Sequence, residues 1–307
     1  MIYFELPSGV IMYRHLWFLL LVLNPVINAQ GKVSSPHLHK SVVFGKGGDT
    51  ELKMNIAVPS GEGKFPLIIL IHGGGWKGGS YEDSGMNTLM KRFAEKGYVG
   101  ACIQYRLTAT GARFPAQVED CKCAVRFLVA QAGKYQIDTD RIGVFGGSAG
   151  GHLALMLGLT TKEDGLEGQG DLLPEYADKP SRVHAVVNLF GPSDLLQGNW
   201  EPAVEPLLVD FLGGPVSEKQ DLAKKASPLT YLNAERNIPP ILTFHGTKDN
   251  IVPYIHATKL HDALAKTKAE HKLITMEGDG HGWPGAKAEE TFQATLKFFD
   301  QHLKTKP

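Results

Sequence analysis

Residues 141–157, RIGVFGGSAGGHLALML, constrain the fold of this chain more than any other stretch. A short apolar run at 142–145 is typical of a buried strand; it breaks at a group of glycines, after which a helix-like apolar pattern resumes. The stretch therefore predicts a strand, a sharp turn and a helix in immediate succession. Gly146, Gly150 and Gly151 lack side chains that could collide where strand and helix meet, so we expect a close approach there.

The centre of this turn matches the pattern G-x-S-x-G, in which a serine stands on a strained turn at the carboxyl end of a strand. The hydroxyl of Ser148 is expected to project above the sheet, over the N-terminus of the following helix. The dipole and free N–H groups of that helix end favour negative charge on a reacting oxygen. A glycine-rich loop with a capping serine is the alternative interpretation, and the partners of Ser148 decide between the two.

Strand-like and helix-like stretches alternate along the rest of the chain, which predicts the α/β class: a mostly parallel, twisted sheet with helices on both faces. The first two strands read as an antiparallel pair at the sheet edge. Predicted strands cover residues 41–44, 51–58, 66–72, 98–105, 142–145, 183–190, 241–245 and 273–276. Besides the helix that follows Ser148, predicted helices cover 86–96, 115–132, 254–265 and 288–302.

The expected organisation is one large domain over residues 41–305, since 307 residues are enough for a single α/β domain with a substantial core. Residues 30–40 read as a polar linker. The polar, acidic stretch 161–180 is predicted to be a surface loop. Residues 195–237 contain several prolines and predict a small helical cap inserted into the domain.

Residues 1–29 have the layout of a secretory signal peptide. Arg14 and His15 precede the apolar run 16–23, and Ala29 is a small residue at the expected cleavage site. The apolar run is shorter than a bilayer crossing needs, so we expect no stable membrane insertion. We expect a secreted or periplasmic protein, with a retained membrane anchor as the alternative.

Charge and cysteine content narrow the classes of partner. Lys plus Arg and Asp plus Glu number 32 each, so no net field favours nucleic acid or an acidic membrane, and a small ligand is the simpler expectation. Cys121 and Cys123 lie two apart on a predicted helix and point to different sides, which argues against a disulfide between them. Neither these residues nor Cys102 has metal-binding spacing, so no metal site is expected.

A serine hydroxyl is a weak nucleophile near neutral pH, so it needs a base and a carboxylate that orients the base. His281 lies in a glycine-rich loop after the last predicted strand and is the candidate base. Asp249 follows the preceding strand and completes the chain order Ser, Asp, His. Asp194, which also follows a strand, is the rival carboxylate, whereas Asp279 is too near His281 in sequence to be favoured.

The sequence HGGGW at residues 72–76 directly follows the apolar run 66–71 of the predicted strand and shares His72 with its end. Its glycines allow the backbone to turn N–H groups inward, where they can bind the oxyanion of a tetrahedral intermediate. We place the donors at Gly74 and Gly75, to within one residue, together with the N–H of Ala149.

Large aromatic residues stand beside these motifs. Trp76 and Trp283 are candidates for the walls of a substrate pocket, and the alternative is that each anchors its own loop. Trp200, in the predicted cap, is a weaker candidate for contact with a sugar or an aromatic acyl group.

Taken together, the motifs resemble those of α/β-hydrolase carboxylesterases of the hormone-sensitive-lipase-like group. They are HGGGW at 72–76, GGSAGG at 146–151, HGTKDNIVP at 245–253 and GHG at 280–282. The chain is most similar to the bacterial feruloyl and acetyl xylan esterase type, and the likeness runs from about residue 41 to 302. Gly147 is a departure, because many relatives of the lipase-like group carry Asp before the nucleophile; it favours the xylan-esterase-like branch.

This resemblance implies serine-dependent ester hydrolysis through an acyl-enzyme, without a metal or another cofactor. Ser148 would attack the ester, His281 would transfer the proton, and Asp249 would hold the imidazole tautomer. The expected substrate is a short-chain or polysaccharide-linked acetyl or feruloyl ester. Two alternatives remain: a formamidase or serine peptidase that uses the same residues, and a non-catalytic binding protein on this scaffold.

Overall fold

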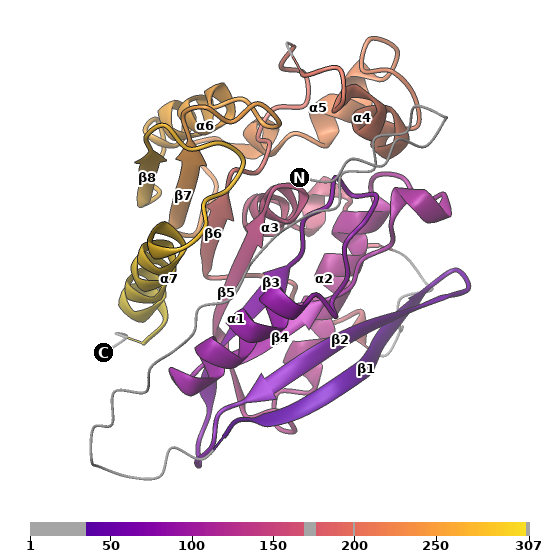
Figure 1. Cartoon of the computed structure of the whole chain (residues 1–307). Coiled ribbons are helices and arrows are strands. Elements are labelled where there is room, and N and C mark those ends of the chain that lie inside the picture. The colour runs from indigo at the N-terminus through magenta and orange to yellow at the C-terminus, as the bar shows by residue number, and fades with distance from the viewer. Residues whose placement is uncertain (1–34, 169–175, 199, 305–307) are drawn as a thin grey trace, which may run out of the picture.

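Eight strands form one mixed sheet in the order β1-β2-β4-β3-β5-β6-β7-β8 (Figure 1). The computed structural model describes residues 35–168, 176–198 and 200–304, so the predicted signal peptide lies outside the described part. Strand β2 pairs antiparallel with β1 and β4, and the remaining neighbours are parallel. The strands are β1 (His37–Gly47), β2 (Thr50–Val58), β3 (Phe65–Ile71), β4 (Val99–Ile103), β5 (Ile137–Gly147), β6 (Ala185–Leu189), β7 (Ile241–Gly246) and β8 (His271–Met276).

Helices cover both faces of this sheet, and two more lie above its upper end in Figure 1. One face carries α1 (Ser84–Glu95) and α7 (Ala286–Phe299), and the other carries α2 (Ala116–Ala130), α3 (Ala149–Leu159) and α6 (Ile255–Leu264). Between β6 and β7 the chain forms α4 (Glu205–Leu212) and α5 (Gln220–Lys225). Short single-turn helices are η1 (Thr108–Thr110), η2 (Lys162–Asp164), η4 (Pro228–Tyr231) and the π-helical η5 (Asp300–Lys304). The predicted α/β class, with helices on both faces, is confirmed.

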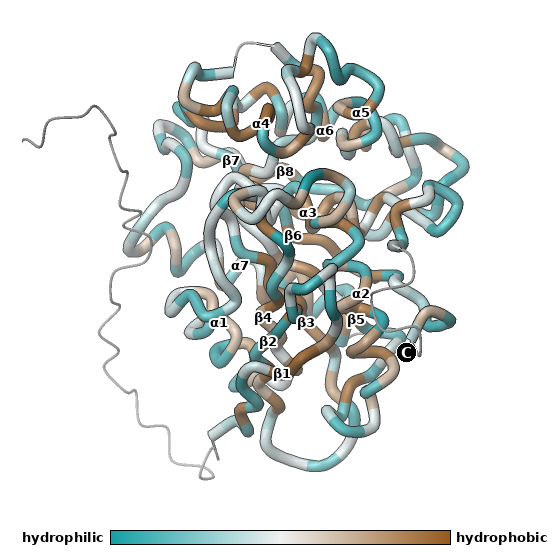
Figure 2. The backbone as a smooth tube through the Cα atoms, turned by 90° about the vertical axis from the view of Figure 1, so that its right-hand side faces the viewer, coloured by the Kyte–Doolittle hydropathy of each residue, from teal (hydrophilic) through white to brown (hydrophobic). Residues whose placement is uncertain are grey.

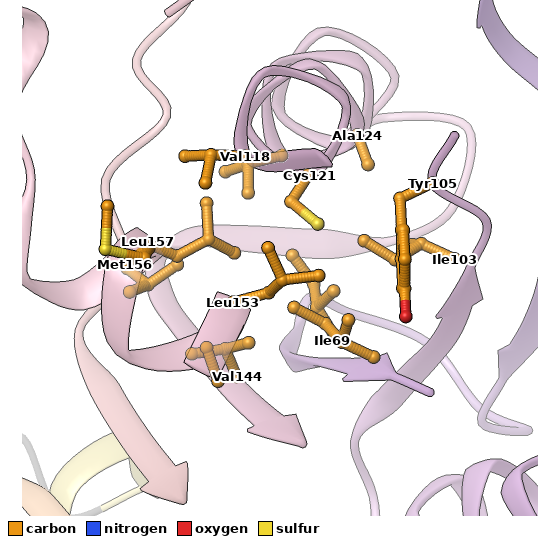
Figure 3. Packing of buried hydrophobic residues seen from close by; sticks show 14 of the residues in the cluster. Ile69, Ile103, Tyr105, Val118, Cys121, Ala124, Val144, Leu153, Met156 and Leu157 are labelled. Carbon is orange, nitrogen blue, oxygen red and sulfur yellow. The ribbon is translucent and has the colours of Figure 1, made fainter. Parts of the chain in front are cut away.

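The central strands are apolar on both sides because helices cover both sides. In β3, Ile69 packs toward α2 and α3, whereas Ile68 and Leu70 belong to the cluster beneath α1 and α7. Figure 3 shows Ile69 and Val144 of the sheet meeting side chains of α2 and α3. Figure 2 shows where the hydrophobic and hydrophilic residues lie along the chain. Brown, hydrophobic segments occur on the inner strands, and teal, hydrophilic segments are common on the outer loops.

The first strand begins earlier than predicted. Residues 37–40, assigned to a linker, belong to β1, and residues 37–39 pair with the end of β2, with His37 opposite Val58 and His39 opposite Ile56. The polar sequence was misleading because an edge strand needs only backbone pairing and leaves many of its side chains in water. A register shift between His39 and Val42 further interrupts the alternation that sequence patterns rely on.

The stretch after α3 is only partly the surface loop that was predicted. Leu166 is fully buried. Glu167 reaches inward and pairs with Lys122 at 2.7 Å and with Arg126 of the same helix, α2. Residues 169–175 of this predicted loop lie outside the described part.

Among the described residues, no helix combines the length and the apolar character that a membrane crossing requires.

The sheet topology decides where a site can form. From β3 the chain continues through α1 to β4 on one side, and from the adjacent β5 it continues through α3 to β6 on the other. Ligands of open α/β sheets bind at such a switch point, beyond the carboxyl ends of the strands. The HGGGW motif follows β3 and Ser148 follows β5, so both predicted motifs lie there.

Candidate active site

Ser148 sits on a strained turn between β5 and α3. Its backbone angles are φ 56° and ψ −124°, a conformation that residues with a side chain rarely adopt. The turn is fixed on both sides, because the Ser148 N–H donates to Leu189 O at 2.9 Å and Ser148 O accepts from His152 N at 3.0 Å. The glycines allow this close packing: a Cβ on Gly146 would lie 2.1 Å from Gly150 O, and one on Gly150 would lie 2.2 Å from Ile71 O.

The structure brings the three predicted catalytic side chains into one hydrogen-bonded line. Ser148 Oγ lies 2.9 Å from His281 Nε2, and His281 Nδ1 lies 2.8 Å from Asp249 Oδ2. An ionised carboxylate only accepts, so Nδ1 carries the proton and Nε2 is free to accept from the serine hydroxyl. This is the tautomer that a general base acting on Ser148 requires.

Asp249 is held as an anion. Its side chain is fully buried, its Oδ1 accepts from Ile251 N and Val252 N at 2.9 Å each, and His245 Nε2 lies 3.3 Å from Oδ2. Burial by itself would raise the pKa of Asp249, but hydrogen bonds from His245 and His281 outweigh it and hold the pKa well below its usual range. The negative charge beside His281 therefore persists throughout the neutral and mildly acidic range.

The rival carboxylates point elsewhere. Asp194 pairs with Lys259 at 3.2 Å and accepts from the Leu196 N–H. Asp279 pairs with Lys287. Neither contacts His281 in the hydrogen bonds that the structure describes.

The HGGGW loop lies against the serine turn. A Cβ on Gly73 would lie 2.9 Å from Gly147 O, and Gly74 and Gly75 have positive φ angles of 107° and 59°. The Tyr105 hydroxyl donates to His72 O at 3.1 Å and lies 3.3 Å from Gly73 O, so it holds the start of the loop. The His72 ring stacks on Tyr105 at 4.3 Å, and burial lowers the pKa of His72 to about 4, which keeps the ring neutral.

Trp76, the last residue of this loop, is anchored as well as placed at the pocket. Its indole N–H donates to His152 Nδ1 at 3.2 Å, while His152 Nε2 donates to Ala226 O at 2.7 Å. These two bonds fix one neutral tautomer of His152, whose pKa burial lowers to about 4. These bonds connect the HGGGW loop, α3 and the segment before β7.

A small pocket of about 20 Å³ opens beside Ser148. Its lining combines the serine turn, the HGGGW loop and apolar side chains from the segments after β6 and β7. The lining residues are Gly75, Trp76, Ser148, Ala149, Pro192, Trp200, Val204, Leu207, Ile251 and Val252. Two of the three predicted oxyanion donors, Gly75 and Ala149, are among them. Gly74 is not; its carbonyl closes a turn by accepting from Lys77 N and Gly78 N.

The predictions for the two other tryptophans have opposite outcomes. Trp283 does not line this pocket: its indole N–H donates to Thr291 Oγ1 at 2.7 Å, and its ring packs edge-on against Phe190. Because Thr291 belongs to α7, this bond anchors the loop that carries His281 to that helix. Trp200, the weaker candidate, does line the pocket and lies over His256 at 4.6 Å.

Sequence reasoning missed the residues that close the pocket and the histidine behind Asp249. Val204 and Leu207 carry no motif, and an apolar residue in a cap reads as ordinary packing. Val252 lies within the motif HGTKDNIVP, but an apolar residue there gave no sign that it faces the pocket. His245, within the motif HGTKDN, had a signal in its spacing, since it lies four residues before Asp249.

In the described ranges, no group of three or more His, Cys, Asp or Glu side chains is arranged to hold a metal ion. The site combines a nucleophile, a correctly protonated base and an ionised carboxylate with the predicted amide donors at Gly74, Gly75 and Ala149. That arrangement can transfer an acyl group to a serine and then to water.

A serine turn after the fifth strand, with His and Asp on loops after the last two strands of the same sheet, defines the class of α/β hydrolases. Residues 54–264 match the BD-FAE family, and the chain belongs to that family.

Similar proteins agree with this placement. The chain is 32% identical to the esterase LipC of Mycobacterium tuberculosis over 77% of its own length and 58% of that protein, so it spans less than two thirds of this relative. A truncated carbohydrate esterase from gut microbiota superposes with a TM-score of 0.77 and 26% identity, over 90% of this chain and 99% of that one. Thermogutta terrifontis Est2, in a propionate-bound structure, gives a TM-score of 0.70 and 25% identity over 89% and 95%. The predicted α/β-hydrolase fold is confirmed.

Proposed function

We propose that this protein is a serine carboxylesterase that works through an acyl-enzyme. The observation that carries the proposal is the relay from Ser148 through His281 to Asp249, with separations of 2.9 and 2.8 Å. The esterases that the chain resembles support the same chemistry.

The geometry suggests how each step proceeds. Ser148 Oγ forms a bond to the ester carbonyl carbon while its proton passes to His281 Nε2. The carbonyl oxygen becomes an oxyanion beside the Gly75 and Ala149 amides; one such donor is worth about 2.7 to 4 kcal/mol in a comparable site. The carbon–oxygen bond to the alcohol then breaks, and His281 protonates the departing alcohol. Water repeats these steps on the acyl-enzyme and releases the acid.

The substrate class that we propose is a short-chain ester, with acetyl or feruloyl groups on polysaccharide as the natural form. Two observations support it: the likeness to a carbohydrate esterase, and the propionate in the similar Est2 structure. Gly147, before the nucleophile, favours the same xylan-esterase-like branch.

The test compares wild type with Ser148→Ala on 4-nitrophenyl acetate and on acetylated xylan, beside labelling by a fluorophosphonate. Wild type should turn over the ester and be labelled, and Ser148→Ala should do neither. Full activity in Ser148→Ala would overturn the mechanism. Turnover of N-formylkynurenine without any ester hydrolysis would replace esterase by formamidase. No turnover and no labelling would indicate a binding protein on this scaffold.

Export through the leader at residues 1–29 is a separate proposal. The basic start, the short apolar run and Ala29 support it. Mass spectrometry of the protein produced with its full leader should find a mature N-terminus near residue 30 in the periplasm or medium. An uncleaved chain in the membrane fraction would favour the retained anchor instead.

A further inference from the structure

Helix α4 packs directly on the end of the HGGGW loop. Three of its residues contact the last two residues of this loop and Lys77, which follows them: they are Leu207, Asp210 and Phe211. Leu207 Cδ1 lies 2.6 Å from the position that a Cβ on Gly75 would occupy, Phe211 stacks on Trp76 at 4.2 Å, and Asp210 pairs with Lys77 at 2.7 Å. The spacing i, i+3, i+4 places these three side chains on one face of the helix, so the helix and the loop form one unit.

The pocket beside Ser148 lies on the acyl side of the bond to be cleaved. His281 must protonate the departing alcohol, so the alcohol has to lie beside His281 Nε2. The lining that the structure describes includes Ser148 and two of the predicted amide donors, Gly75 and Ala149, but not His281. The part of an ester that enters this pocket is therefore the acyl group.

The pocket is also very small. A volume of about 20 Å³ has room for about one water molecule. Of all acyl groups with a carbon substituent, acetyl carries the smallest one, a single methyl group, and is therefore the best match to this space. Four of the pocket's ten lining residues belong to the HGGGW loop and the serine turn, and three belong to the loops directly after β6 and β7. The segment before β7 contributes Trp200, Val204 and Leu207, and Leu207 is the one whose methyl group lies over the amide donor Gly75.

We infer that Leu207 is the residue that limits the acyl group, so that the enzyme prefers acetyl esters to esters of longer acyl groups. Of the two natural forms proposed above, this inference keeps the acetyl ester and excludes the feruloyl ester. This inference rests on the proposed esterase function. Leu207 is half-buried and lines the pocket, and none of the contacts described for it is with Ser148, His281 or Asp249, so we expect it to act on acyl length.

The experiment measures kcat/KM for two substrate series in wild type and in Leu207→Ala. One series varies the acyl chain on 4-nitrophenol from acetate to butyrate and octanoate, and the other varies the alcohol of acetate esters. Wild type should prefer acetate to butyrate by about tenfold or more. Leu207→Ala should raise the butyrate-to-acetate ratio by about tenfold and leave the alcohol series unchanged.

Two variants serve as controls. Val209→Ala removes a similar side chain from the same helix outside the pocket and should keep the wild-type ratio. Leu207→Met preserves volume, so it should keep acetate preference. A folded Leu207→Ala with an unchanged acyl ratio, or one that shifts the alcohol series, overturns the inference. Loss of acetate hydrolysis in Ser148→Ala supports the esterase function whatever Leu207 does, so the two failures are separate.

Discussion

Asp249 combines a catalytic and a structural role in one side chain: one oxygen faces His281, and the other accepts two backbone N–H groups of its own loop. We expect Asp249→Asn to lower kcat on 4-nitrophenyl acetate by about 10⁴-fold, because an amide no longer fixes the His281 tautomer. Asp194→Asn is the matched control, since Asp194 also follows a strand but pairs with Lys259. Equal losses in the two variants would contradict the assignment of Asp249.

The lowered pKa of Asp249 has a consequence for stability. A carboxyl whose pKa is depressed by folding stabilises the protein above its unfolded pKa, about 3.9, and this contribution is lost as the pH falls through the folded pKa. The difference in unfolding free energy between wild type and Asp249→Asn should therefore stay constant from pH 8 to about 5 and shift against wild type below about pH 4. Urea unfolding at several pH values measures it, and a difference that does not change down to pH 3 would count against this account.

At the scale of elements, the junction of β5 and α3 should tolerate a side chain at one glycine but not at another. A Cβ on Gly146 would overlap backbone atoms of Gly150, whereas a Cβ on Gly147 would meet the Phe190 ring at an ordinary 3.4 Å. Gly146→Ala should therefore destabilise the protein by about 3 kcal/mol or more, while Gly147→Ala should fold and keep its activity. Thermal unfolding of both variants tests the pair; similar midpoints would show that the junction can relax.

Local elements were predictable from sequence because each carries its own signal. The buried strands, the serine turn and the HGGGW loop have distinctive composition and spacing. The packing of α4 on residues 75–77 had no such signal. The spacing of residues 207, 210 and 211 predicts that this face of the helix contacts another part of the chain, but it does not say which part. Asp249 was predicted from the chain order Ser, Asp, His, whereas the contact that occupies the rival Asp194 is with the distant Lys259 and had no signal in the sequence. Long-range contacts of this kind are set by packing of the whole chain rather than by local pattern.

At the scale of the whole molecule, a buried ion cluster ties the segment after α3 to α2. Glu167 pairs with Lys122 and Arg126, whose side chains are 1% and 6% exposed, and Ser181 Oγ donates to the same carboxylate at 2.9 Å. Burial lowers the pKa of Lys122, against the pull of Glu167. The cluster is thus a place where distant segments are held by charge within an otherwise apolar interior.

Removing one partner should cost more than removing the pair. Glu167→Gln takes the shared counter-charge from the buried Lys122 ammonium and from the buried Arg126 guanidinium, so we expect a loss of about 3 kcal/mol in unfolding free energy. The double variant with Lys122→Met removes one of the two unpaired charges and leaves Arg126, so it should recover part of that loss, because apolar replacement of a buried pair is often close to neutral. Asp178→Asn, in an exposed pair with Lys179 at 3.0 Å, should leave the unfolding midpoint unchanged. In every folded variant kcat on 4-nitrophenyl acetate should stay at the wild-type value, since the cluster does not contact the catalytic relay. If Glu167→Gln lowers the unfolding free energy as little as Asp178→Asn does, water reaches Lys122 and the cluster does not hold the segment.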